Sequence, residues 1–163
     1  MKFTLKRKHD EIADTARYRG VPDVKLGTRV KYQDTYGTVI GAGGRGAYFY
    51  AFMDEGIVKM FHPSDIKFIF DGSAPQAPHA LNIYGVWNSK YPPEEYDEVP
   101  AVHVRLSRDK AKSFEYHRWL EWDDGVSYID FRARLLGHID RDGRVVDYAD
   151  VVEVDPKPKP RKW

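Results

Sequence analysis

The chain has 163 residues, and its 26 Lys and Arg against 25 Asp and Glu leave a formal charge of only +1 at pH 7. This length allows one domain or two small ones and excludes multi-lobed enzymes and long repeat arrays. There is no cysteine, which excludes disulfide frameworks, thiolate metal sites and thiol nucleophiles. With 42% hydrophobic and 31% charged residues, we expect a packed core under a well-hydrated surface.

Charge is unevenly distributed along the chain. Residues 1–72 carry +3, residues 73–155 carry −6 and residues 156–163 carry +4. A domain of +3 attracts nucleic acid only weakly, so any phosphate contact would depend on local basic patches. No run approaches the ~18 consecutive apolar residues of a membrane-spanning helix. We therefore expect no membrane partner and a cytoplasmic or virion-associated location.

The first element in chain order is a short helix. Residues 10–19 read DEIADTARYR, in which Ile12 and Ala16 lie four apart on one helical face. Gly20 and Pro22 then end the helical pattern. This is the only helix that we predict.

Residues 26–70 have the pattern of short strands separated by Gly and Asp turns. Val30 and Tyr32 alternate with polar residues, and aromatic side chains recur every second residue from position 48 to 52. Four or five strands in about 50 residues are too few for a sandwich, so we expect them to close into a small barrel. We expect Tyr48, Tyr50 and Phe52 to face the core of this barrel.

Residues 71–80, DGSAPQAPHA, have the composition of a connector. Beyond it, residues 99–107 alternate as a strand, and residues 113–122 favour a strand over a helix. Turn signals at 123–125 and 140–143 predict two hairpins. The predicted fold is mainly β, with an N-terminal barrel unit over 1–72, a linker over 73–80, an antiparallel β domain over 81–155 and an extended basic tail over 156–163.

Residues 26–69 resemble the SH3-like small β-barrel superfamily of the KOW and Tudor type. The resemblance lies in the opening 26–30, the turn 36–40 into a second strand, Glu55-Gly56, and the turn 62–66 before the last strand. It implies a binding barrel, because this superfamily includes nucleic-acid-binding, methyl-peptide-binding, ribosomal, polymerase-associated and viral assembly proteins. The motifs do not choose among these ligands.

Three sequence patterns that could indicate a cofactor or metal site lack the neighbouring residues or elements that such a site needs. Residues 41–46 fit G-x-G-x-x-G, but the dinucleotide motif needs a following helix, and residues 47–52 alternate as a strand. A hairpin loop with Arg45 at its tip fits better. The six histidines form no metal-binding pair, and the 140–143 turn lacks the other acidic residues of a calcium loop. We therefore expect no metal, no cofactor and no enzyme.

Aromatic and basic residues supply the positive evidence for binding. They interleave at the start of the predicted barrel, where they could stack bases, hold cationic side chains or anchor a protein. The tail ends in alternating prolines, cations and a terminal tryptophan, which suits docking into a groove. The candidate binding residues are Arg29, Lys31, Tyr32, Tyr36, Arg45, Lys157, Lys159, Arg161, Lys162 and Trp163.

We expect a non-enzymatic structural or accessory protein that contacts protein partners in a larger assembly, such as a viral (phage) particle or a nucleoprotein complex. The first alternative is a nucleic-acid-binding regulator that uses the barrel loops and the basic tail. The second is a small hydrolase built from His103, His117 and nearby carboxylates. Salt dependence separates the first two, because phosphate binding weakens steeply with salt concentration.

Overall fold

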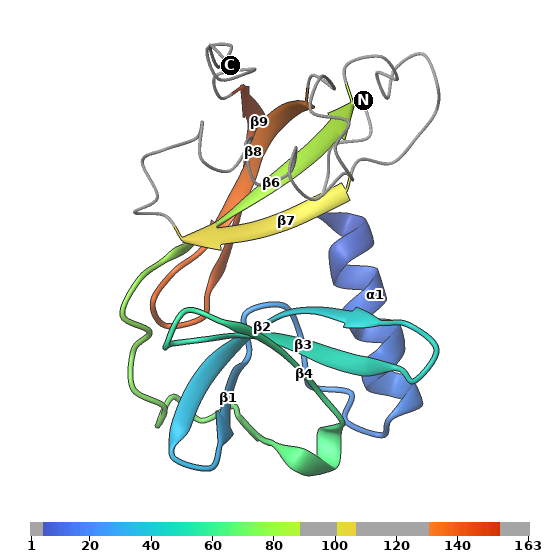
Figure 1. Ribbon diagram of the computed structural model, residues 1–163, viewed down its shortest axis with the longest axis vertical. Coiled ribbons are helices and arrows are strands. Elements are labelled where there is room, and N and C mark those ends of the chain that lie inside the picture. The colour runs from blue at the N-terminus through green and yellow to red at the C-terminus, as the bar shows by residue number, and fades with distance from the viewer. Residues whose placement is uncertain (1–4, 89–100, 107–130, 154–163) are drawn as a thin grey trace, which may run out of the picture. The chain divides into compact units, whose positions relative to one another are not determined.

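The computed structural model describes residues 5–88, 101–106 and 131–153. These residues form one α-helix, nine strands and a short 3-10 turn (Figure 1), so the prediction of a mainly β protein with one N-terminal helix is confirmed. The elements are α1 (Lys6–Tyr18), β1 (Arg29–Tyr32), β2 (Thr35–Gly43), β3 (Tyr48–Met53), β4 (Val58–Phe61), η1 (Pro63–Asp65), β5 (Lys67–Ile69), β6 (Leu81–Asn88), β7 (Ala101–Leu106), β8 (Phe131–Ile139) and β9 (Val145–Glu153).

The chain divides into two compact units. Of the described residues, 5–81 and 138–146 form the N-terminal unit, and 82–88, 101–106, 131–137 and 147–153 belong to the second unit. The turn of the β8–β9 hairpin thus belongs with the N-terminal unit, although it lies more than 55 residues further along the chain. Residues 71–80, the predicted connector, contain no helix or strand.

Helix α1 begins at Lys6, four residues before the predicted start at position 10. It ends at Tyr18, just before Gly20, as predicted. Ile12 and Ala16 are fully buried, as their spacing predicted. Gly20 has φ +71°, and the amides of residues 19–21 bond back to carbonyls of residues 15–17. The helix runs beside β2 and β3 (Figure 1).

The N-terminal sheet is antiparallel, with strand order β4-β3-β2-β1-β5. Residues Gly41–Gly43 end β2, and β3 begins at Tyr48 after a four-residue turn. The glycine-rich segment therefore joins two neighbouring strands, as predicted, and no helix follows it to cradle a dinucleotide. A bulge between Val39 and Gly41 bends β2 within this ladder.

The prediction that these strands close into a barrel is wrong at the level of the backbone. Among the described residues neither sheet closes, and β4 and β5 are the edge strands of the N-terminal sheet. The two edge strands are short, with four residues in β4 and three in β5. The Tyr32 and Phe61 rings lie 5.0 Å apart, and the Phe49 and Phe68 rings 5.3 Å apart. The sheet is thus curled around an aromatic core.

The structure reverses the predicted orientation of β3. Phe49, Ala51 and Met53 are fully buried, whereas the side chains predicted to face the core at positions 48, 50 and 52 are half-buried on the opposite face. Both alternating sets of β3 are apolar, so the pattern predicts a strand without choosing its inner face. The ring of Phe49 meets Phe68 of β5, and that contact decides which set lies inside.

The second sheet has strand order β7-β6-β8-β9. Strand β7 and the hairpin turn at 140–143 match the prediction, and the turn closes through bonds between Asp140 and Arg144. Strand β6 was not predicted, because Gly85 interrupts its apolar pattern. The strand expected at 113–122 and the turn expected at 123–125 lie outside the described residues.

Candidate interaction surface

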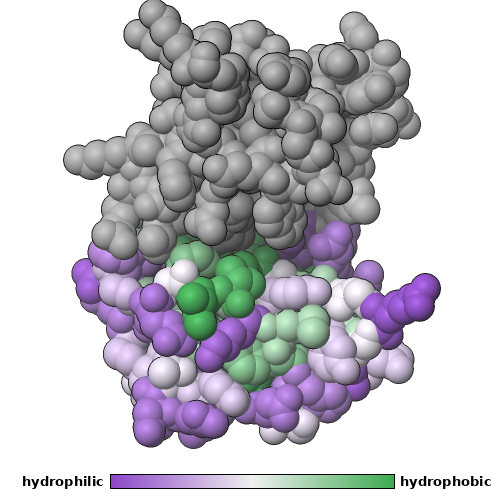
Figure 2. Space-filling model, in the orientation of Figure 1, coloured by the Kyte–Doolittle hydropathy of each residue, from purple (hydrophilic) through white to green (hydrophobic). Residues whose placement is uncertain are grey.

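The outer face of the N-terminal sheet presents apolar side chains over β3 and β4. In the antiparallel ladder, Tyr50 lies opposite Met60 and Phe52 opposite Val58, so these four side chains share one face. We call this set the β3–β4 face. Val58 is 52% and Met60 is 55% exposed, while Tyr50 and Phe52 are half-buried. Figure 2 shows hydrophobic side chains gathered over these strands.

Two cations near this face, Arg29 and Lys59, are paired with carboxylates of the chain. Arg29 donates to both carboxylate oxygens of Asp54 at 2.8 and 2.7 Å. Its remaining bonds go to the Thr38 hydroxyl and to the carbonyl of Pro75. On the β4 side, the Lys59 amine lies 3.7 Å from the Glu55 carboxylate. The β3–β4 face is therefore apolar, and the cations of Arg29 and Lys59 at its border have carboxylate partners.

Lys8 of α1 lies where the helix meets strand β2, close to Gly41. Its amine is 3.4 Å from the position that a Cβ on Gly41 would occupy, and its carboxylate neighbour Glu11 is 4.0 Å away. Burial lowers the pKa of the Lys8 amine, and the negative charge of Glu11 raises it in part. Lys8 is therefore a partly desolvated cation between the helix and the sheet.

The predicted binding residues fall into different environments. Lys31 and Tyr36 are cross-strand partners, and the Lys31 amine lies 5.7 Å from the Tyr36 ring centroid on the outer face. Tyr32 points to the other face, where its ring meets Phe61. Arg29 is only 4% exposed and fully engaged through its terminal nitrogens, so it supports the fold rather than offering a free cation.

Arg45 is exposed in the β2–β3 turn, and Arg19 holds this turn in place. Arg19 donates to the carbonyls of Gly46 and Ala47, and its guanidinium lies 5.7 Å from the Tyr48 ring centroid. It also contacts His62 Nε2 at 3.0 Å. The turn is therefore anchored to the end of α1 while Arg45 points away from the fold.

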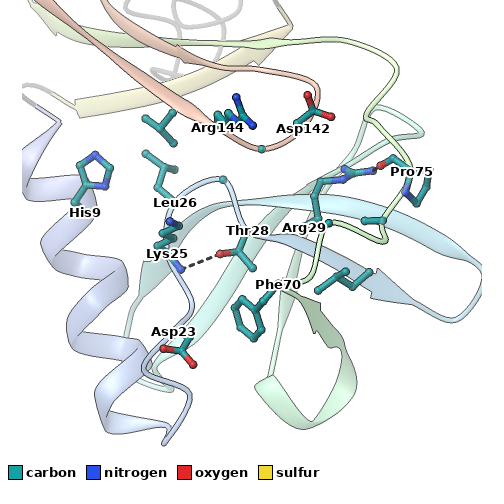
Figure 3. A pocket seen from close by; sticks show the side chains of 16 residues that line it. His9, Asp23, Lys25, Leu26, Thr28, Arg29, Phe70, Pro75, Asp142 and Arg144 are labelled. Atoms are coloured by element: carbon teal, nitrogen blue, oxygen red, sulfur yellow. Dashed lines mark hydrogen bonds between the residues drawn. The ribbon is translucent and has the colours of Figure 1, made fainter.

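A pocket of about 870 Å³ lies elsewhere on the N-terminal unit. Figure 3 shows His9 of α1, Lys25 and the β8–β9 turn residues Asp142 and Arg144 around it. Its lining carries the cations of Lys25, Arg29 and Arg144 and the carboxylates of Asp23 and Asp142. The Arg29 guanidinium is already paired with Asp54.

The remaining candidate residues lie outside the part of the chain whose side chains the structure describes. The tail residues Lys157, Lys159, Arg161, Lys162 and Trp163, and also His117, lie outside the described residues, and nothing is described of the His103 side chain. Among the described residues, no three His, Asp or Glu side chains gather as metal ligands would. Within the same part of the chain, no helix has the length and apolar character needed to cross a membrane.

Sequence reasoning missed the β3–β4 face itself. The alternation of Val58, Lys59, Met60 and Phe61 was available as a signal, but it does not say which pair faces out. Comparison of the chain with protein-family models, with curated proteins and with solved structures found no match.

Proposed function

We propose that this protein is a non-enzymatic interaction protein that works as a structural or accessory part of a larger assembly. The observation that carries the proposal is the β3–β4 face, on which Val58 and Met60 are each more than half exposed beside Tyr50 and Phe52. Single exposed apolar side chains are common, but adjoining ones on one sheet face are typical of an interaction site. A partner that covers this face would remove apolar surface from water.

The architecture supports this reading. The five-stranded order, with the 3-10 turn η1 just before β5, is consistent with the resemblance of residues 26–69 to SH3-like barrels. We therefore extend the proposal to membership of residues 26–69 in that superfamily, which implies a binding role. A viral (phage) particle or a nucleoprotein complex, in the cytoplasm or in a virion, remains the proposed setting.

A protein partner fits the face better than a nucleic acid. Phosphate binding needs Lys or Arg side chains that are free to replace the counterions around the phosphates. Arg29 and Lys59 already have carboxylate partners, whereas the apolar face offers stacking and burial without charge. Arg45 is exposed and could contact a phosphate, so nucleic-acid binding is the alternative function. The experiments must distinguish it from binding of a protein partner.

Site-specific photo-cross-linking in the native source tests the proposal. A photoreactive phenylalanine analogue is placed at position 58, and a matched control carries it at Val146, which is 41% exposed on β9. We expect position 58 to capture one defined protein that position 146 does not. The captured protein, once purified, should bind wild type directly, and Met60→Asp should weaken this binding while Val146→Asp should not.

Salt titration decides between the two ligand classes. An apolar protein contact should keep its affinity between low and physiological salt, because little counterion release accompanies it. Binding of labelled single-stranded or duplex oligonucleotides that falls steeply with salt, and that Arg45→Ala weakens, would instead support the nucleic-acid-binding regulator. Capture of the same proteins at positions 58 and 146 would reject the β3–β4 face as the docking surface.

A further inference from the structure

The pocket of about 870 Å³ lies wholly within the N-terminal unit and shares no residue with the β3–β4 face. Sites that hold small molecules have volumes of this order. Figure 3 shows Thr28 near its centre, with Phe70 on one side and Arg144 of the β8–β9 turn on the opposite side. Pro75 of the connector lies on a third side. Segments that are far apart in the chain thus surround one concave site.

The floor of the pocket, formed by the buried residues Thr28 and Arg29, presents hydrogen-bond donors. The terminal nitrogens of Arg29 are engaged, mainly by Asp54, but its Nε is buried and has no hydrogen-bond partner within the described part of the chain. The Thr28 hydroxyl oxygen accepts from the Lys25 amide at 3.0 Å, which leaves its own proton available to donate. A buried donor without an acceptor is costly, so the floor lacks an acceptor group.

The rim of the pocket carries charges of both signs. Lys25 and Arg144 are exposed and form no ion pair with any residue that the structure describes. Asp23 and Asp142 lie on the same rim, and Asp142 accepts a hydrogen bond from the Gln76 amide at 2.9 Å. Because these two carboxylates offset the two cations, the donors of the floor decide which ligand group fits. A carboxylate only accepts, and its hydrogen bonds to a guanidinium are charge-assisted, so it is the group that the floor selects.

Phe70 supplies an apolar wall. Its ring is 57% exposed and stacks on the Phe68 ring with the centroids 6.4 Å apart, so it offers a supported aromatic surface that a flat group can cover. We propose that this pocket binds a small carboxylate whose flat apolar part covers the Phe70 ring. The carboxylate accepts from Arg29 Nε and from the Thr28 hydroxyl. This inference goes beyond the proposed function, because it adds a small-molecule site to a protein whose proposed docking surface lies elsewhere.

Titration of the full chain with phenylacetate tests the proposal, because this probe carries only the carboxylate and the ring that the pocket selects. In isotope-labelled protein, the Nε–H resonance of Arg29, assigned through its own side-chain carbons, reports the contact directly. We expect this resonance to shift saturably, with a Kd in about the millimolar range for a probe of this size. The matched probe 2-phenylethanol has the same ring without the charge, and we expect it to bind about tenfold more weakly.

Two variants and a control locate the probe in the pocket. Phe70→Ala removes an exposed ring and should weaken phenylacetate binding about fivefold, and Thr28→Val removes one donor with a similar loss. Tyr18→Ala removes an exposed ring outside the pocket and should leave the Kd unchanged, and it is the control for Phe70→Ala even if Thr28→Val disturbs the loop before β1. An Arg29 Nε–H resonance that phenylacetate does not shift, equal affinity for the two probes, or equal Kd values for Phe70→Ala and Tyr18→Ala would overturn the proposal.

Discussion

Gly27 and Gly143 approach each other so closely that neither position has room for a side chain. The carbonyl of Gly143 occupies the place that a Cβ on Gly27 would take, and the carbonyl of Gly27 occupies the same place for Gly143. Both residues have positive φ, +92° and +90°. The β8–β9 turn is thereby seated against the loop before β1.

We predict that Gly27→Ala and Gly143→Ala each destabilise the protein by more than about 2 kcal/mol, because each adds a backbone collision to the cost of a positive φ. Gly20→Ala is the control, since Gly20 has φ +71° with open space around it. It should cost about 1 kcal/mol. Urea unfolding measures all three, and equal costs would show that the close approach contributes nothing.

The ion pair between Arg29 and Asp54 should be far more important for stability than the surface pairs. Asp54→Asn leaves the buried guanidinium of Arg29 without a counter-charge, which we expect to cost about 3–5 kcal/mol. Asp10→Asn removes the exposed partner of Lys6 and should cost less than about 1 kcal/mol. Thermal unfolding of the two variants gives the comparison. Similar melting temperatures would contradict the role assigned to Arg29.

We predict that Lys8 makes the free energy of unfolding depend on pH in the alkaline range. Burial lowers the pKa of its amine below the ordinary 10.5, so the folded protein releases this proton at lower pH than the unfolded chain does. The unfolded state then binds more protons, and stability rises with pH up to about the unfolded value. The free energy of unfolding of wild type relative to Lys8→Met should therefore increase as pH rises towards 10.5. Lys6→Met, at an exposed position of the same helix, is the control variant.

The reversed orientation of β3 can be tested by paired truncations. Phe49→Ala removes a fully buried ring that packs on Phe68 and should cost about 3–5 kcal/mol. Phe52→Ala removes a half-buried ring from the β3–β4 face and should cost less than half as much. Chemical denaturation measures both. A larger loss for Phe52→Ala would place the core on the face first predicted from the sequence.

The local elements of this protein could be predicted from the sequence because their causes are local. Gly20 ends α1, the glycines at 41–46 end β2 and turn the chain, and Asp140 to Gly143 close a hairpin through bonds between near neighbours. Each of these features depends on backbone preferences within a few residues. The sequence also excluded a dinucleotide site at residues 41–46 for a local reason. Such a site needs a helix after the glycines, and residues 48–53 form a strand.

Tertiary structure alone decided which faces of those elements are buried. Strand β3 is apolar on both sides, and only the meeting of Phe49 with Phe68 places one side in the core and leaves the other as a candidate interaction surface. The sequence predicted Arg29 as a binding residue, but its guanidinium is paired with the carboxylate of Asp54, which lies 25 residues further along the chain. Pairings across such distances depend on how the whole chain packs, and no local pattern of residue types contains that information.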